Sequence, residues 1–377
     1  MRGWIRNLLV FAFFLQNASP SIADGMPSIG DFGLAHSIIP AQQNGIEVRF
    51  AAPKVVVTPA GPIIVAVLAR NASDPTRGGV PSVAVSTDGG AKFGPLRSLR
   101  SDAADAEYVA ATEFALGLAP DGSVILLSQA TDKKSSAPVN GWRSSDQGVS
   151  WQPVNLSAWH RNQVETVFGG ILQVPNKGLL AFGFAPRRPH ENSHSIWEAR
   201  STDGGLNWSP ARAVPFASQL QHAQPTLINT GEQFVGLVRT DPNTFVQIAP
   251  RDQGGKWDIS APGILSKDPA PQADPHPCLA VDPMNSRHLL ALLPERIHAD
   301  GANLVRGRIA LYHCDLNQLR WHHRGDIARC SPEFEKDITA KSAWLTPLGG
   351  RRWLAIFYCD TASVAGDLYG LTFELTP

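Results

Sequence analysis

Short apolar runs separated by turn residues recur along the chain from Arg49 onward. The first two runs, residues 55–58 and 63–68, are rich in Val and Ile and flank a Pro- and Gly-containing turn at residues 59–62. Runs of this length and composition, bounded by Gly and Pro, predict β-strands. Because they are apolar along their whole length, as strands covered on both faces are, periodicity alone also allows a short buried helix. The turns and the β-branched residues favour strands.

The same arrangement returns five more times. Further pairs of apolar runs occupy residues 113–118 and 124–129, 167–174 and 179–184, 225–228 and 234–239, 278–281 and 288–293, and 342–345 and 353–358. Each pair fits the inner and second strands of one sheet. The pattern therefore predicts six sheets.

A second pattern, Ser-x-Asp-x-Gly-x-x-aromatic, follows the third strand of the early repeats. Full copies contain Asp88, Asp146 and Asp203, a partial copy contains Asp252, and a degenerate fifth surrounds Asp315. In such a pattern Asp hydrogen-bonds the backbone, Gly accepts a positive φ, and the aromatic ring folds over the turn. Successive Asp residues from the first to the fourth copy lie 58, 57 and 49 positions apart. This is room for one four-stranded sheet per repeat, as in a propeller.

These motifs resemble the Asp boxes of sialidases, and residues 46–377 resemble a sialidase-like β-propeller. The resemblance implies an all-β, six-bladed propeller with four-stranded antiparallel blades. It also implies that each box lies on an outer turn between third and fourth strands. Residues 24–45 are expected to be a leading segment that supplies the strand closing the ring. Boxes in that family lie away from the active centre and occur in non-enzymes, so they do not decide the chemistry.

Charge and composition exclude some partners. The chain has 33 basic and 33 acidic residues and a sequence pI of about 7.2, so nothing favours nucleic acid or an anionic membrane surface. We expect one large domain, since propellers of this length are single domains, and a monomer.

The N-terminus predicts export. Arg2 and Arg6 precede an apolar run at residues 8–15, and small residues lead to Ala23. This is typical of a secretory signal peptide spanning residues 1–23, and the apolar run is too short to cross a bilayer. The alternative is a buried N-terminal element. The signal peptide predicts a secreted or bacterial periplasmic protein.

Export would permit disulfides among the four cysteines, Cys278, Cys314, Cys330 and Cys359. The most local pairing joins Cys314 to Cys330, and the alternative is that these are buried thiols. No Cys or His spacing is typical of zinc, so no metal or other cofactor is expected, although loop carboxylates could bind Ca²⁺.

Candidate chemistry lies at the mouth of the channel. In a propeller the inner strands line a central channel, and their N-terminal ends ring one mouth of it with the residues that end the second strands. That rule places several Arg side chains there, together with the carboxylates of Glu113 and Glu165. Because guanidinium groups bind carboxylates bidentately, the mouth favours an anionic or heavily hydroxylated ligand.

Sialidases hold the sugar carboxylate with three arginines, use an Asp as acid/base, and attack with a Tyr that a Glu activates. The resemblance implies a set of roles for substrate binding: Arg49, Arg70, Arg239, Arg308 and Tyr358. It implies a second set for catalysis: Asp74 at the acid/base position, Gln224 in the place of the family's Glu, and Glu165 as a replacement carboxylate.

The chain departs from the family pattern at three places. Arg49 is two residues further from Pro53 than the pattern requires, and Asp74 is one residue short of the usual spacing. No Tyr occurs near Ser342, where the nucleophile is expected. For each Arg the alternative is an ion-paired rim residue, and for Asp74 an ordinary turn residue.

The pattern favours a sialidase-like glycoside hydrolase that acts on an acidic-sugar glycan, with a degenerate Tyr/Glu pair. One alternative is a non-catalytic propeller that binds glycan or protein. Another is an assembly factor of the cell envelope.

Overall fold

The structure is a computed structural model of the chain. It describes residues 28–29, 34–73, 79–99, 108–109, 113–129, 131–132, 139–160, 166–184, 196–214, 226–231, 234–240, 244–250, 257–258, 272–273, 278–298, 305–317, 320–329, 339–360 and 365–376.

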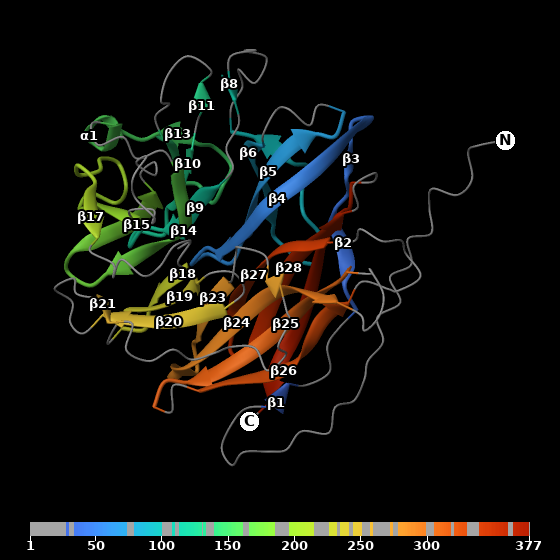
Figure 1. The fold of residues 1–377 in the computed structure, drawn as a ribbon. Coiled ribbons are helices and arrows are strands. Elements are labelled where there is room, and N and C mark those ends of the chain that lie inside the picture. Colours follow the sequence, from blue (N-terminus) through green and yellow to red (C-terminus); the bar gives the residue numbers. More distant parts are fainter. Residues whose placement is uncertain are drawn as a thin grey trace, which may run out of the picture.

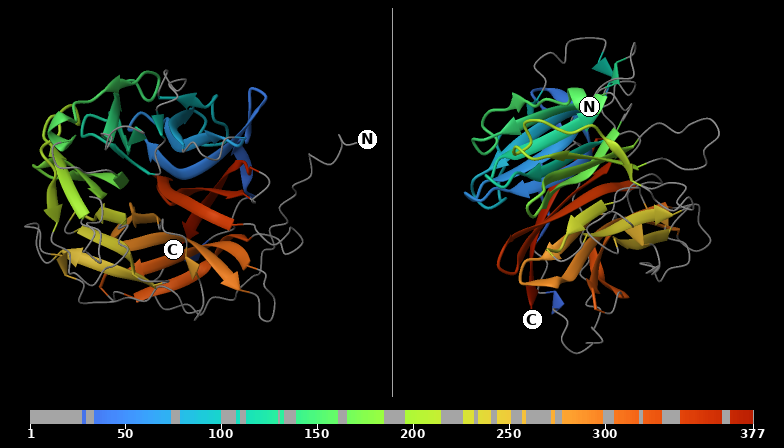
Figure 2. Two further views of the ribbon diagram at one scale, coloured as in Figure 1. Left: turned by 45° about the horizontal axis from the view of Figure 1, so that its top comes forward. Right: turned by 90° about the vertical axis from the view of Figure 1, so that its left-hand side faces the viewer.

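Almost every described element is a β-strand, and the sheets follow one another around a centre in chain order (Figure 1, Figure 2). The one described helix, α1 (Ser157–His160), has four residues. The first sheet is an antiparallel meander whose strands pair in chain order: β3 (Gln42–Gln43), β4 (Ile46–Val57), β5 (Ile63–Asn71), β6 (Val80–Ser86) and β7 (Arg97–Ser98).

The next sheet has eight strands and consists of two meanders. The first meander contains β9 (Phe114–Leu118), β10 (Val124–Gln129), β12 (Val139–Ser144) and β13 (Gln152–Pro153). The second contains β14 (Thr166–Val174), β15 (Gly178–Phe184), β16 (Ile196–Ser201) and β17 (Arg212–Val214). The first strands, β9 and β14, pair in parallel at Leu116 and Gly170, so the innermost strands of neighbouring meanders lie side by side. A separate short ladder joins β8 (Tyr108–Val109) to β11 (Thr131–Asp132).

Three sheets complete the chain. One contains β18 (Thr226–Asn229), β19 (Phe234–Thr240), β20 (Thr244–Pro250) and β21 (Trp257–Asp258). The next contains β22 (Gln272–Ala273), β23 (Cys278–Asp282), β24 (Asn285–His298), β25 (Val305–Asp315) and β26 (Arg320–Arg329). The last contains β27 (Thr339–Gly349), β28 (Arg352–Asp360) and β29 (Leu368–Thr376), with β1 (Ser28–Ile29) and β2 (His36–Ile39) added to β29.

The N-terminal and C-terminal parts of the chain meet in this last sheet. Strand β2 pairs with β29 in antiparallel fashion, with His36 opposite Gly370 and Ile39 opposite Leu368. Residues 36–39 therefore add an outer strand to a sheet made from the C-terminus.

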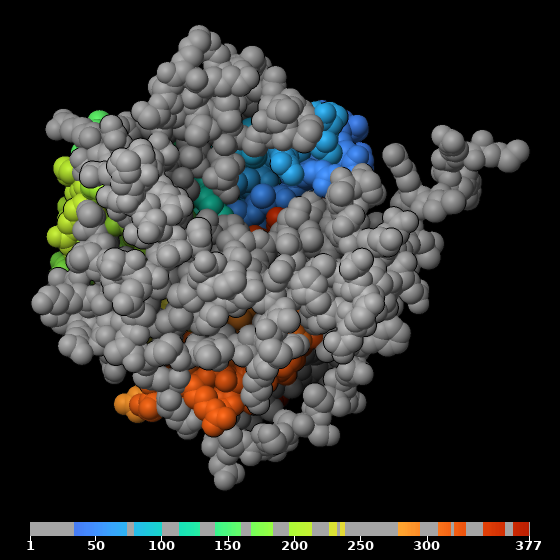
Figure 3. Space-filling model, in the orientation of Figure 1, coloured from blue at the N-terminus to red at the C-terminus, as the bar shows by residue number. Residues whose placement is uncertain are grey.

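The inner strands form a closed ring. Each contacts the next in the order β4, β9, β14, β18, β23 and β27, and β27 contacts β4 again. Red atoms of the last sheet accordingly lie beside blue atoms of the first in the space-filling view (Figure 3). This is the arrangement of a β-propeller, with apolar inner strands around a central channel.

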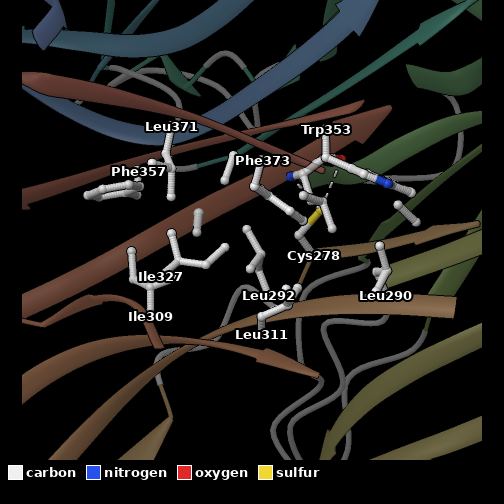
Figure 4. Packing of buried hydrophobic residues seen from close by; sticks show 14 of the residues in the cluster. Cys278, Leu290, Leu292, Ile309, Leu311, Ile327, Trp353, Phe357, Leu371 and Phe373 are labelled. Carbon is white, nitrogen blue, oxygen red and sulfur yellow. Dashed lines mark hydrogen bonds between the residues drawn. The ribbon is translucent and has the colours of Figure 1, made fainter. Parts of the chain in front are cut away.

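The core lies between neighbouring sheets. Figure 4 shows Cys278 of β23 among apolar side chains, with Trp353 and Phe373 from the last sheet and Leu292 and Leu311 from the preceding one. The Leu345 backbone N–H donates to Cys278 Sγ at 3.1 Å, so the thiol also ties β23 to β27.

The described cysteines are thiols. Both Cys278 and Cys314 are free and buried, so the Cys314–Cys330 pairing expected from sequence proximity is wrong. Burial raises the pKa of each thiol to about 12. Cys314 faces the core between its own sheet and the preceding one, where it packs as a small apolar residue.

Three of the box turns have one geometry. At Asp203, the Ser201 hydroxyl donates to the carboxylate at 2.8 Å and accepts from Gly205 N–H at 2.9 Å. The Asn207 N–H donates to the same Asp203 oxygen at 2.9 Å, and Trp208 Nε1 donates to Gly205 O at 3.1 Å. The turns at Asp88 and Asp146 repeat the Ser, Gly and Asp bonds and, like Asp203, connect the third and fourth strands of a meander. The indole bond recurs at Trp151 of the Asp146 turn, whereas the Asp88 turn has Phe93 in that place.

These hydrogen bonds lower the pKa of the box carboxyl groups. The Ser150 hydroxyl and backbone N–H lower the pKa of Asp146 to about 2. At Asp315 the geometry differs, because its carboxylate accepts from the N–H two residues on, Asn317, at 2.8 Å. Asp252 lies outside the described residues.

Each box turn also bonds to the preceding sheet. Arg97 of the first sheet donates to Gly148 O at 2.5 Å and Val149 O at 2.9 Å, and Arg143 of the next meander donates to Gly204 O at 3.0 Å. For the first box, the preceding sheet is the last one, and its His36 ring nitrogen lies 3.2 Å from Ala91 O. The boxes therefore join neighbouring sheets at the outside of the ring.

Candidate functional site

Two arginines face each other where the first sheet begins. In the pairing of β4 with β5, Arg49 lies directly opposite Arg70, and both side chains are partly exposed. This is the end of the channel where the inner strands begin, which we call the channel mouth. Two guanidinium groups on opposed residues can hold a bidentate anion, because directly opposed side chains share one face of a sheet.

A β-bulge lies between Arg49 and Lys54. Ala51 pairs with Leu68 and Lys54 with Ala66, so two residues of β4 face one residue of β5. Ala52 within the bulge has a φ of 49°, which is left-handed and unusual for a residue other than Gly. The bulge takes up one of the two extra residues that separate Arg49 from Pro53.

A buried ion pair lies further along β4, beyond the bulge. Lys54 Nζ is 3.2 Å from Glu113 Oε2, and the two side chains are 6% and 4% exposed. Glu113 immediately precedes β9, so the pair joins the first two meanders at their inner strands. The sequence rule placed Glu113 at the mouth but did not identify Lys54 as its partner.

The channel below the mouth is apolar. A cavity of about 270 Å³ is lined by residues from each of the described inner strands, among them Val55, Leu116, Ile171, Leu227, Leu279 and Trp344. A larger hollow of about 820 Å³ lies at the other end, around the β14–β15 and β18–β19 turns, and no charged side chain lines it. The larger hollow therefore lies at the opposite end of the channel from the Arg49–Arg70 pair. Its lining is uncharged, whereas the mouth carries two guanidinium groups.

The nucleophile position in the last sheet holds Ser342. Strand β27 begins at Thr339, earlier than the apolar run predicts, because its polar first residues still pair with β28. Ser342 is buried and lies opposite Tyr358. Tyr358 is 4% exposed and packs among apolar side chains between the last and first sheets, including Phe50 and Ile38. A role for Tyr358 in substrate binding stays a prediction.

Arg308 has a carboxylate beside it. It lies on β25, the third strand of its meander, and its Nη1 is 3.9 Å from Asp326 Oδ1, with side chains 13% and 3% exposed. The ring of His323 is 2.9 Å from the same oxygen. The structure therefore does not bring Arg308 together with Arg49 and Arg70 by any described contact.

The other candidates are only partly described. Arg239 lies on β19 with its backbone opposite Phe245, and its side chain lies outside the described part. Asp74, Gln224 and Glu165 also fall outside it, so their roles stay predictions.

No group of three or more His, Cys, Asp or Glu side chains in the described residues is arranged to hold a metal ion. No described helix is long and apolar enough to cross a membrane.

Comparison with known proteins identifies the fold. No protein-family model and no curated protein sequence matches the chain. Solved structures do match over most of it. A protein of unknown function from Dyadobacter fermentans is 16% identical, with a TM-score of 0.60 over 90% of this chain and 99% of the other.

Two enzymes are similar to the same extent. Trypanosoma rangeli sialidase, solved with sialic acid, is 15% identical with a TM-score of 0.62, over 93% of this chain and 59% of the sialidase. Penicillium chrysogenum α-L-arabinanase, solved with arabinobiose, is 11% identical with a TM-score of 0.64, over 92% of this chain and 99% of the arabinanase. The chain has the sialidase-like propeller fold, which confirms the prediction of an all-β propeller. At these identities the likeness shows the fold alone.

Proposed function

We propose that this chain is a sialidase-like glycoside hydrolase that binds an acidic sugar at the channel mouth. The observation that carries the proposal is the Arg49–Arg70 pair. The two residues lie opposite each other on β4 and β5, and both side chains are partly exposed. Two cations on one face attract a carboxylate and can hold it with parallel hydrogen bonds. The structural likeness to glycosidases supports the choice of a glycan as ligand.

We assign the remaining roles from the sequence. Asp74 follows Arg70 by four residues and is proposed as the acid/base, and Arg239 as a further carboxylate ligand. We also propose six blades, counted as one per inner strand, and an exported protein that begins near Asp24 after removal of the signal peptide.

A non-catalytic glycan-binding propeller is the second candidate. It is favoured by Ser342, which is buried at the position where the resemblance expects an exposed Tyr nucleophile. Ser lacks the phenolate that the family uses, and no described base is bonded to it.

A hydrolysis assay separates the two candidates. The substrates are a synthetic α-sialoside and a β-glucuronide, and neutral glycosides are assayed for comparison. Asp74→Asn should lower kcat about 10²–10⁴-fold with little effect on affinity, because an acid/base acts in the transition state. Arg239→Ala should weaken binding instead. Arg352→Ala, an exposed Arg at the β27–β28 turn, is the matched control.

The hydrolase and the non-catalytic binder predict different results in this assay. Turnover that survives both Asp74→Asn and Arg239→Ala would reject the site. Binding of acidic sugars without turnover in the unmodified protein would establish the non-catalytic candidate.

A further inference from the structure

The bulge in β4 determines which side of the sheet Arg49 occupies. Arg49 and Lys54 are five positions apart, so in a regular strand they would point to opposite faces. Their partners on β5, Arg70 and Ala66, are four positions apart and therefore share one face. The extra residue in the bulge thus puts Arg49, Arg70 and Lys54 on the same face.

That face is turned toward the second meander. Ala66 packs in the cluster that includes Phe114 and Leu116 of β9. Lys54 Nζ lies 4.3 Å from the centre of the Phe114 ring and forms an ion pair with Glu113 Oε2 at 3.2 Å. Three cationic side chains from the first sheet therefore share the face that meets the start of β9.

Lys54 also contacts the last sheet. Its Nζ lies 5.4 Å from the centre of the Trp344 ring, and Trp344 Nε1 donates to Val55 O at 3.1 Å. The ammonium group of the first sheet is held by two aromatic rings and one carboxylate, which come from the two sheets on either side of it in the ring.

Stability alone does not account for this arrangement. Removing two charges from water costs several kcal/mol, and replacing a buried ion pair by apolar residues is often neutral or stabilising. A left-handed φ at Ala52 adds a further cost. The best-attested benefit of a buried polar group is that it fixes register. A slip of one residue in β4 would carry Arg49 to the opposite face.

We propose that Lys54, held by Glu113, is a positioning residue: it fixes the bulged register of β4 and so keeps Arg49 opposite Arg70. The importance of this register for ligand binding rests on the proposed function. The register itself does not, and it can be measured without a ligand.

Cross-linking reports the register directly. Directly opposed residues lie about 4.5–5.5 Å apart at Cα, within the range that a disulfide bridges. A double-cysteine variant, Arg49→Cys with Arg70→Cys, is made in two backgrounds. One is the otherwise unmodified chain, and the other carries Lys54→Met and Glu113→Leu. The two charges are replaced together so that neither is left buried alone. A chain without the new cysteines is the control for the native thiols, and mass mapping identifies the bridge.

We expect the 49–70 bridge to form at least ten-fold faster in the unmodified background than in the Lys54→Met/Glu113→Leu background, with melting temperatures that differ by only a few degrees. In parallel, the Lys54→Met/Glu113→Leu chain with its arginines intact should bind N-acetylneuraminic acid at least ten-fold more weakly.

Equal cross-linking rates in the two backgrounds would overturn the proposal, whatever happens to binding. A slower rate in a protein whose unmodified form binds no acidic sugar would support the positioning role and reject the proposed function. If the double replacement fails to fold, Ala52→Gly gives the second measurement. It allows the left-handed φ and keeps the pair, so it should leave the cross-linking rate unchanged, and a slower rate would contradict the role assigned to Lys54.

Discussion

Replacing Trp208 by Ala tests the box turns as links between sheets. Trp208 is 4% exposed, and it packs with Ile125 and Leu127 of the preceding meander in one cluster. Its ring meets Trp159 of α1 edge to face at 6.1 Å, and its Nε1 donates to Gly205 O. The substitution removes this packing and one hydrogen bond while leaving the Asp203 turn in place.

The expected loss follows from that burial. Truncating a buried Trp to Ala costs about 3–5 kcal/mol. With an unfolding entropy of about 2.1 cal/mol/K per residue over 377 residues, this corresponds to a fall in Tm of roughly 4–6 °C. Chemical denaturation gives the free energy of unfolding, and a thermal scan gives the shift in Tm.

Trp151 is the matched control. It occupies the same position in the box of Asp146 and donates to Gly148 O at 3.2 Å, but it is only half-buried. Trp151→Ala should therefore cost roughly half as much, about 1.5–2.5 kcal/mol. Equal losses for the two substitutions, or a loss below about 1 kcal/mol for Trp208→Ala, would refute the reasoning.

Three further predictions concern single groups. Burial, and then the charge of Arg324, lower the pKa of His313 to about 3, so the unfolded chain binds a proton that the folded chain does not. The free energy of unfolding should therefore decline as the pH falls below about 6.5. His313→Leu should weaken that decline in urea titrations, and an unchanged pH dependence in the variant would contradict the role of His313. Gly205 has a φ of 89°, and an added Cβ would overlap Ile125, whereas Gly89 has a φ of 79° and open space. Gly205→Ala should cost about 2–5 kcal/mol and Gly89→Ala about 1–2 kcal/mol, and a reversed order in denaturation would refute the packing account. Cys278 and Cys314 should resist iodoacetamide at pH 8 until the protein unfolds, and alkylation of the folded protein, mapped by mass spectrometry, would contradict their burial.

The fold could be predicted from the sequence where its signals are local. A box turn is closed by bonds within five residues, such as Ser201 to Asp203 and Gly205 to Ser201, so its pattern is visible in a short window. The inner strands are visible for a similar reason, since each is a continuous apolar run beside a turn. The exact ends were less predictable: β24 extends to His298, well beyond its apolar centre, because its polar end still pairs with β25.

The site was less predictable because its contacts join distant residues. Lys54 and Glu113 are 59 positions apart, and no local pattern indicates that they form an ion pair. The bulge at Ala52 has no Gly to mark it, so the side of the sheet that Arg49 occupies could not be read from alternation. The choice between a Cys314–Cys330 disulfide and buried thiols stayed open for a related reason: proximity in sequence does not orient Cys314, whose strand directs it into the core.

Equilibrium binding of an acidic sugar tests the central claim most directly. N-acetylneuraminic acid is titrated calorimetrically into the unmodified protein, into Arg70→Ala and into the control Arg352→Ala. Losing one partner of a charge-assisted pair costs about 2–5 kcal/mol, so Arg70→Ala should bind at least about thirty-fold more weakly, while Arg352→Ala binds as the unmodified protein does. Equal affinity in Arg70→Ala and Arg352→Ala would contradict an acidic-sugar site at the channel mouth.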